Sequence, residues 1–133
     1  CYQRVTAIQN DLLHKFTTMI YQMYDTVVIE ELDVQTMQMQ KKAKNLHRSL
    51  FGRFRLYMEY KAIKFDKTLI LADQFYPSTQ RCSRCGHVKT GDDRIGLNGN
   101  KKHGTKHNEY ICYSCGFVGD RDQNAVLNLL ALA

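Results

Sequence analysis

The sequence contains no apolar run close to the roughly 18 residues that a membrane span requires, and it opens without the basic start and apolar core of a signal peptide. These absences predict a cytoplasmic protein with no membrane partner. The chain also lacks an initiator Met, since it begins at Cys1, and we expect it to have been cut from something longer. A hydrophobic fraction of 44% is too high for a disordered tail, and 133 residues suit one domain, or one domain with a small appendage.

Four of the five cysteines form two C-x2-C pairs that are each followed by glycine: Cys82 with Cys85, and Cys112 with Cys115. Two such pairs can present four thiolates to one ion, which predicts a structural Zn²⁺ site with no open position for catalysis. The glycines after the pairs, Gly86 and Gly116, can take the positive φ that folds the backbone around a metal. Two disulfides or a redox C-x-x-C are the alternatives, but nothing indicates secretion and a redox site needs only one pair.

Hydrophobic periodicity predicts an alternation of helices and strands. Over residues 3–24, apolar side chains recur at spacings of three and four and predict an amphipathic helix; they are Val5, Ile8, Leu12, Phe16, Met19 and Met23. A second helix is predicted over residues 46–65, with a stripe of Leu46, Leu50, Phe54 and Tyr57. The apolar runs at 26–29 and 68–72 predict strands, and the first should be covered on both faces, as in a sheet with helices packed on it.

The remaining segments complete the predicted order. Residues 35–45 have no clean period and predict a mobile connection, and the Gly-, Asn- and Lys-rich stretch between the cysteine pairs predicts a loop or hairpin. A short helix is predicted over residues 125–130. The order helix, strand, helix, strand, ribbon, helix therefore predicts an α/β fold with a four-Cys zinc ribbon inserted late.

The basic charge is concentrated in one segment. Residues 41–67 hold nine lysines and arginines against two acids, which is more than the whole net charge of +6. A basic stripe of this kind follows phosphate backbones and predicts nucleic-acid binding. The alternative is a solvated helix face, as most charge runs are. The residues predicted to contact nucleic acid are Lys41, Lys42, Lys44, Arg48, Arg53 and Arg55.

Two acids stand where an α/β active site would need them. Glu30 follows the first predicted strand, and Asp122 precedes the last predicted helix. Active sites collect at the carboxyl ends of strands, and phosphodiester cleavage by Mg²⁺ or Mn²⁺ needs converging carboxylates. Each acid also has a structural interpretation: Glu30 as a solvated strand end, and Asp122 or Asp120 as a helix cap. Composition and spacing alone favour the structural interpretation.

Several segments resemble, in order, one family of transposon-encoded nucleases. Residues 28–34 (VIEELDV) are similar to the second RuvC motif of the TnpB (OrfB) family of RNA-guided nucleases, and residues 52–61 and 76–86 are similar to the family's segments downstream of that motif. Residues 112–117, and then 120–128, resemble the family's zinc ribbon running into its third RuvC motif. The opening helix, with residues 10–15, fits as well. The resemblance implies a partial RNase-H-like (RuvC) fold, kin to the type V CRISPR effectors.

The resemblance also implies a division of the chain and a set of roles. Residues 1–80 would be a RuvC-like segment, 81–119 the zinc ribbon and 120–133 the third-motif helix. Glu30 and Asp122 would be metal carboxylates, with Asp120 as the second choice at the later position. Mg²⁺ or Mn²⁺ would be the catalytic ion, and a guide RNA and a DNA target would be the partners.

Two departures from the family pattern shape these expectations. The family's first-motif Asp lies upstream of anything present here, so the remaining N-terminal part, or a partner chain, would have to supply it, and the chain alone is expected to be inactive. An outer edge of the first strand should then lack a neighbour. The gap of 26 residues between the cysteine pairs is longer than expected, and we interpret its His103 and His107 as loop residues.

The alternatives to a nuclease are a non-catalytic zinc-ribbon module that binds DNA or RNA and a transposition accessory protein.

Overall fold

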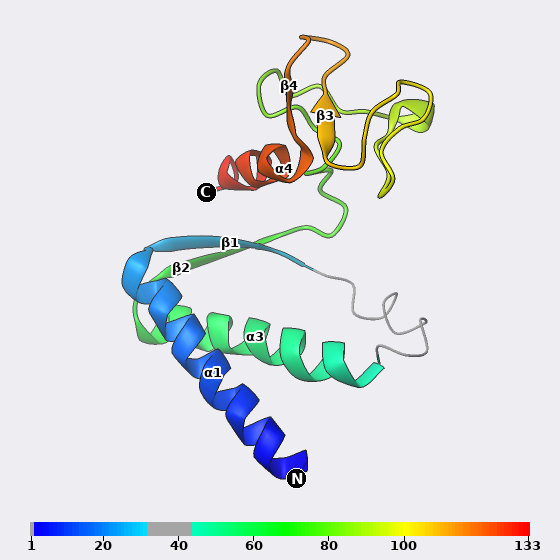
Figure 1. Ribbon diagram of the computed structural model, residues 1–133. Coiled ribbons are helices and arrows are strands. Elements are labelled where there is room, and N and C mark those ends of the chain that lie inside the picture. The colour runs from blue at the N-terminus through cyan, green and yellow to red at the C-terminus, as the bar shows by residue number, and fades with distance from the viewer. Residues whose placement is uncertain (1, 32–43) are drawn as a thin grey trace. The chain divides into compact units, whose positions relative to one another are not determined.

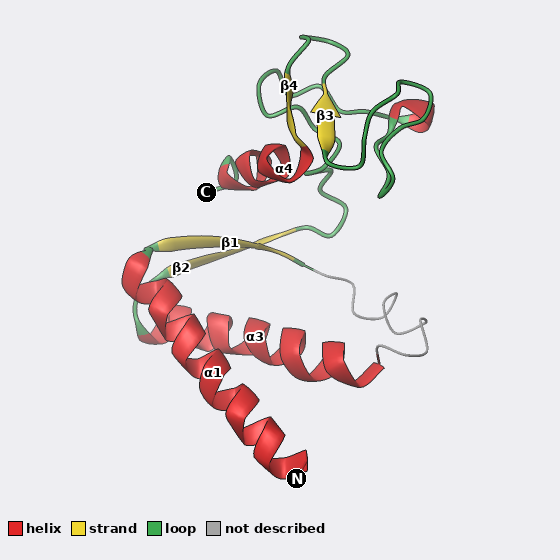
Figure 2. Ribbon diagram, in the orientation of Figure 1, coloured by secondary structure: helices red, strands yellow, loops and turns green. Residues whose placement is uncertain are grey.

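The computed structural model describes residues 2–31 and 44–133, which are drawn as a ribbon in Figure 1 and coloured by secondary structure in Figure 2. The chain divides into two units, residues 1–74 and residues 75–133, and each unit has its own buried cluster. Most of the predicted connection at residues 35–45 lies outside the described residues. Among the described residues, no helix is both long enough and apolar enough to cross a membrane.

The first unit contains two helices and two parallel strands. Helix α1 (Tyr2–Met23) leads into β1 (Thr26–Glu30), and α3 (Lys44–Lys64) leads into β2 (Thr68–Ala72). The strands pair in parallel, with Thr26 opposite Thr68 and Glu30 opposite Ala72, so their carboxyl ends lie at one edge. Both helices lie on the same side of the two strands (Figure 1). The predicted mixed α/β order is confirmed. In this first unit the helix and strand limits differ from the predicted ones by no more than two residues, whereas the last helix of the chain begins at Arg121, four residues before its predicted start.

One face of this small sheet is covered by the helices. Val27 and Leu69, which are opposite each other in the register, pack against the buried cluster of Tyr21, Met58 and Ala62. Within the first unit both helices cover the same face, and the coverage of the other face stays a prediction. Within the described residues, β1 pairs with β2.

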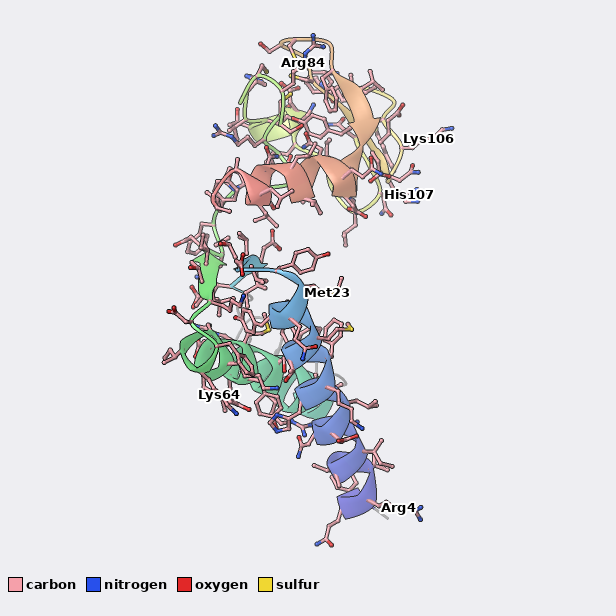
Figure 3. All side chains as sticks on the ribbon, turned by 90° about the vertical axis from the view of Figure 1, so that its left-hand side faces the viewer. Arg4, Met23, Lys64, Arg84, Lys106 and His107 are labelled. Carbon is pink, nitrogen blue, oxygen red and sulfur yellow. The ribbon has the colours of Figure 1, made fainter. Side chains whose placement is uncertain are left out.

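The apolar stripe of α1 forms as predicted and is half exposed, although the ring centroid of Phe16 lies 6.2 Å from that of Phe54 on α3. Figure 3 shows this helix from Arg4 near its start to Met23 at its end. Exposed fractions along the stripe run from 46% at Met19 to 63% at Met23. A contiguous row of half-exposed apolar side chains marks a surface that normally meets another structure. The residues of the stripe are Val5, Ile8, Leu12, Phe16, Met19 and Met23.

The opposite, polar face of α1 makes the contact with α3. Tyr21 is buried and its hydroxyl donates to the carbonyl of Met58 at 2.8 Å. Lys61 is also buried, and its ammonium donates to the carbonyl of His14 and to two threonine hydroxyls on α1 at 2.7–2.9 Å. Burial, followed by the charge of Lys64, lowers the pKa of Lys61. Hydrogen bonds and the apolar cluster of Tyr21, Met58 and Ala62 therefore act together in the packing of these two helices.

The second unit is a small ribbon followed by a helix. Strand β3 (Glu109–Ile111) pairs antiparallel with β4 (Val118–Asp120), which runs directly into α4 (Arg121–Leu130). The stretch between the cysteine pairs contains loops, isolated bridges and one short 3₁₀ helix, η1 (Gly91–Asp93), so its predicted loop or hairpin character is confirmed. The buried Gln80 amide holds this stretch by donating to the carbonyl of Ile95 and accepting from its N–H, both at 2.8 Å.

Candidate functional site

The four predicted cysteine ligands come together in the second unit. Their sulfur atoms all lie within 4.8 Å of one another, with 3.8 Å from Cys82 to Cys115 and 3.6 Å from Cys85 to Cys112. A tetrahedron with metal–sulfur bonds of about 2.3 Å has edges of about 3.8 Å, whereas a disulfide needs about 2.05 Å between sulfur atoms. The cluster therefore suits one metal ion and excludes the two-disulfide alternative. In the described part of the chain, no other group of three or more His, Cys, Asp or Glu side chains brings its possible ligand atoms this close together.

The two cysteine pairs have the same backbone geometry. In each, the glycine that follows adopts a positive φ, 79° at Gly86 and 76° at Gly116, and its N–H donates to the carbonyl of the first cysteine at 2.9–3.0 Å. The N–H of that cysteine donates in turn to the residue after the glycine, Cys82 to His87 and Cys112 to Phe117, at 2.8 Å. The predicted use of glycine in these turns is confirmed, since an L side chain is strained at such φ values.

The environment of the thiols differs between the buried and exposed positions. Cys82 and Cys112 are buried and Cys85 is exposed. Although burial raises it, hydrogen bonds from the backbone N–H groups of Cys115 and Ser114 lower the pKa of Cys112 to about 6. A backbone hydrogen bond from His87 lowers the pKa of Cys85, but burial and contact with the other three thiols raise it to about 11. Four thiols at this spacing resist losing all their protons, and a bound cation would remove that resistance.

Two buried asparagines of α4 form hydrogen bonds with the backbone at and before the first cysteine pair. The sequence did not predict this role for them. Asn124 donates to the carbonyl of Arg81 at 2.7 Å and accepts from the N–H of Ser83 at 2.9 Å. Asn128, one turn later, donates to the carbonyls of Ser78 and Arg81, both at 2.7 Å. Asparagines four residues apart on a helix were the available signal, because they share one face. This contact joins the metal cluster to the helix that carries Asp122.

Of the two adjacent acids at the end of β1, Glu31 is engaged in a structural contact. Its carboxylate pairs with the Arg55 guanidinium at 3.0 Å, and Arg55 also pairs with Glu59 at 2.9 Å. These hydrogen bonds, first that of Glu59 and then that of Glu31, raise the pKa of Arg55. Glu30 is the last residue of β1 and is exposed at the carboxyl edge of the parallel pair. Its position matches the predicted one at the end of the strand.

The two aspartates at the start of α4 also differ in the contacts that their carboxylates make. Asp120 is the N-cap, and its Oδ1 accepts from the N–H groups of Asp122 and Gln123 at 2.9 and 3.0 Å. Capping was one of the interpretations left open by the sequence, and it holds for Asp120. The Asp122 side chain is 77% exposed and lies 3.2 Å from Arg121 Nε. Glu30 belongs to the first unit and Asp122 to the second.

The predicted nucleic-acid contacts are only partly described. Lys41 and Lys42 lie outside the described residues, as do the side chains of Lys44 and Arg48. Arg53 contacts α1, where it donates to Asn10 Oδ1, and to Gln9 Oε1 at 3.3 Å. Arg55 is held by two glutamates, as described above. Other basic side chains are exposed on the second unit, among them Arg84, Lys106 and His107 (Figure 3).

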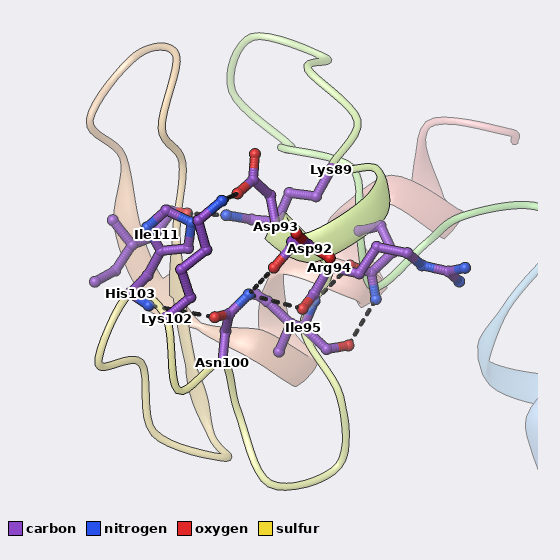
Figure 4. A network of polar contacts seen from close by, with 10 residues as sticks. Lys89, Asp92, Asp93, Arg94, Ile95, Asn100, Lys102, His103 and Ile111 are labelled. Atoms are coloured by element: carbon purple, nitrogen blue, oxygen red, sulfur yellow. Dashed lines mark hydrogen bonds and ion pairs between the residues drawn. The ribbon is translucent and has the colours of Figure 1, made fainter.

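His103, the other histidine considered as a loop residue, contacts a neighbouring acid and an aromatic ring. Its Nε2 lies 2.7 Å from Asp93 Oδ1, and its ring stacks on that of Tyr113 with centroids 4.0 Å apart. Lys102 lies 3.2 Å from the same carboxylate oxygen, and Figure 4 shows the three side chains together. The hydrogen bond from His103, followed by that from Lys102, lowers the pKa of Asp93.

The family model and the relatives that match this chain all indicate the same protein family. Residues 51–129 match the family described as Cas12f1-like, TNB domain. A Streptomyces pristinaespiralis protein named as an RNA-guided DNA endonuclease is 33% identical over 131 residues, which are 98% of this chain and 30% of that protein. A Mycobacterium tuberculosis protein named in the same way is 27% identical over 135 residues, or 96% of this chain and 26% of that protein. A TnpB-like protein of Acanthamoeba polyphaga mimivirus is 27% identical over 139 residues, or 97% and 24%.

A solved structure is similar over nearly the whole chain. A chain in the cryo-EM structure of a Cas12f1–sgRNA–target DNA complex superposes with a TM-score of 0.61 and 18% identity, covering 96% of this chain and 35% of that one. At this identity the likeness concerns the fold alone. The chain spans about a third or less of the length of each of these relatives.

Proposed function

This chain belongs to the family of Cas12f1-like TNB domains, and we propose that it is the C-terminal part of an RNA-guided, metal-dependent DNA endonuclease of the TnpB kind. The observation that carries the proposal is the family match over residues 51–129, because that range holds both cysteine pairs and Asp122. The relatives named as RNA-guided DNA endonucleases support the same activity. The partners are a guide RNA and a DNA target, and pairing between them reads the sequence.

Within this function, the four cysteines hold a structural Zn²⁺. The support is the tetrahedral spacing of the sulfur atoms and the all-thiolate donor set, which is typical of closed zinc sites. With all four positions filled by protein, this ion has no site for substrate. We assign residues 81–119 to this ribbon, and residues 1–80 and 120–133 to the RNase-H-like (RuvC) part of the chain.

Glu30 and Asp122 are the proposed ligands of the catalytic ion. Both are exposed carboxylates with hard oxygen donors, at the end of a parallel strand and in the first turn of a helix. Mg²⁺ or Mn²⁺ bound there would act as a Lewis acid on the scissile phosphate and its nucleophile. The third acid comes from the remaining N-terminal part, or from a partner chain. The exposed apolar stripe of α1 supports such a partner, because it offers a surface for a further element of the nuclease.

Cleavage by a chimaera tests this function. The chain replaces the corresponding 131 residues of the Streptomyces pristinaespiralis relative, and cutting of target DNA is measured with guide RNA and Mg²⁺. We expect cleavage that is abolished by Glu30→Gln or Asp122→Asn. The matched controls are Glu31→Gln and Asp120→Asn, which make the same chemical change at the neighbouring acids. Asparagine caps a helix as well as aspartate does, so the second control retains α4.

Three results would contradict the nuclease. Cleavage that survives both Glu30→Gln and Asp122→Asn would remove these residues from the catalytic site. A chimaera that binds guide and target without cutting would favour a non-catalytic DNA- or RNA-binding module. Binding to transposon ends that needs no guide RNA would favour a transposition accessory protein. The basic residues of the segment 41–67 are tested in the same system, since a substitution that removes a phosphate contact should lower the salt dependence of binding.

A further inference from the structure

Lys89 is a cation buried in the second unit, with no acidic partner among the described residues. The residue is 2% exposed, and its ammonium donates to the backbone carbonyl of Ile111 (Figure 4). The ring centroids of Tyr113 and Tyr110 lie 3.2 Å and 4.9 Å from Lys89 Nζ. None of the ion pairs found within the described residues includes Lys89.

This arrangement needs a source of negative charge. Lysine is almost never fully buried unless it is paired, because an ammonium loses its hydration when it leaves water. The other buried lysine, Lys61, donates to three oxygen atoms, whereas the bond seen for Lys89 among the described residues goes to a single carbonyl. Cation–π contact with two rings compensates for part of the hydration that the Lys89 ammonium loses on burial. A nearby anion would compensate for the rest of that loss.

The contacts of Lys89 point to the cysteine cluster as that anion. Ile111 precedes Cys112 and Tyr113 follows it, so two of the groups that touch the ammonium flank a metal ligand. Tyr110 shares one buried cluster with Cys82 and Cys112, the two cysteines farthest from solvent. Lys89 therefore contacts groups that flank Cys112 or share a buried cluster with it, in a region where solvent screens charge least.

Four thiolates around one divalent ion carry a net charge of −2, half of which a single ammonium would neutralise. We propose that Lys89 is the counter-cation of the tetrathiolate metal centre, a positioning residue that favours the metal-bound state through its charge. The proposal rests on the Zn²⁺ assigned to this cluster. The two tyrosine rings would hold the ammonium in place, and the hydrogen bond to Ile111 would fix it beside Cys112.

The test measures metal binding by the full 133-residue chain. Zn²⁺ affinity is obtained by competition with a chelator for wild type, Lys89→Met, Lys89→Arg and Lys101→Met. Lys89→Met should weaken Zn²⁺ binding by about tenfold to hundredfold, the usual effect of changing a group behind the metal ligands. Lys101→Met removes the same charge from an exposed position of the same unit and should stay within about twofold of wild type. Lys89→Arg keeps the charge and should lie closer to wild type than Lys89→Met.

A spectroscopic measurement separates charge from packing. A positive charge beside the thiolates stabilises their donor electrons, so the thiolate-to-metal charge-transfer bands of the Co²⁺-loaded chain should move to lower energy in Lys89→Met and not in Lys101→Met. If Lys89→Met does not fold, Lys89→Gln replaces it, since the amide can still donate to the Ile111 carbonyl but carries no charge.

The outcomes distinguish this proposal from the metal assignment. A wild-type chain that binds no Zn²⁺ would overturn the assignment and, with it, the role of Lys89. A wild-type chain that binds Zn²⁺ while Lys89→Met matches Lys101→Met, in affinity and in band position, would overturn the role of Lys89 alone. If Lys89→Met and Lys89→Arg lose the same Zn²⁺ affinity and the charge-transfer bands of the Co²⁺-loaded chain do not move, Lys89 acts through its packing and not through its charge.

Discussion

The buried asparagine on α4 provides a direct test of how the helix and the metal cluster are joined. Asn124 is 1% exposed and bridges Arg81 and Ser83 through its amide. In Asn124→Ala both hydrogen bonds are lost. The Arg81 carbonyl still accepts from Asn128, but the described contacts leave no other acceptor for the Ser83 N–H. Ser83 lies inside the first cysteine pair, so the loss falls on the backbone that positions two of the four thiols.

The size of the effect can be worked from these hydrogen bonds. A neutral hydrogen bond contributes about 1 kcal/mol, and a buried donor left unpaired costs about 1–3 kcal/mol. We therefore expect Asn124→Ala to lower the free energy of unfolding by about 2–3 kcal/mol. In a unit of about 60 residues, 1 kcal/mol shifts the melting temperature by about 4–8 °C. The expected fall in Tm is thus about 10 °C or more.

The assay measures release of Zn²⁺ on heating at a fixed free zinc concentration, because bound metal itself raises Tm. Zinc release reports the second unit, which carries all four ligands. The matched control is Gln123→Ala, which changes an exposed neighbour on the same helix to the best helix former and should alter stability by less than about 0.5 kcal/mol. An Asn124→Ala chain that melts within about 2 °C of the control would refute the reasoning.

Three further predictions concern the metal, the pH dependence and the apolar stripe. Cys112→Ser should reduce bound zinc from about one ion per chain to none and unfold the ribbon, as elemental analysis and circular dichroism would show. Because hydrogen bonds from His103 and Lys102 lower the pKa of Asp93, its contribution to stability is complete above the ordinary value of about 4 and is lost as pH falls through the lower folded value. The Tm difference between wild type and Asp93→Asn should therefore shrink below about pH 4. Leu12→Asp should reduce aggregation of the isolated chain in light scattering and impair the chimaera, whereas Lys15→Asp, on the exposed helix surface, should do neither.

Hydrophobic periodicity located the helices but not the faces by which they pack. In α1, the stripe from Val5 to Met23 defines the helix correctly, yet the side that meets α3 carries Thr17 and Tyr21. That contact includes hydrogen bonds between residues 37 to 47 positions apart, such as Lys61 with His14. Hydropathy cannot show such a pairing, because either residue taken alone resembles an ordinary surface side chain. The stripe itself stays half exposed among the described residues.

The metal cluster was predictable because its geometry is local. A C-x2-C-G segment determines the turn that brings two thiols together, and two copies predicted the four thiols that cluster. The groups behind the ligands were not predictable. Asn124 reaches Ser83 across 41 residues, and Lys89 reaches Ile111 across 22. The spacing of Asn124 and Asn128 indicates one helix face, but the sequence does not show which distant residues an asparagine or a lysine contacts.

The adjacent acids show what the structure adds to a choice that the sequence leaves open. Both Glu30 and Glu31 follow an apolar strand, and both Asp120 and Asp122 precede a helix, so position alone does not separate them. Glu31 pairs with Arg55, Asp120 caps α4, and Asp122 accepts from Arg121 Nε at 3.2 Å. These contacts predict different effects for the two control substitutions. Glu31→Gln removes the charge that pairs with Arg55 and should lower stability by less than about 1 kcal/mol, whereas Asp120→Asn keeps a residue that caps α4.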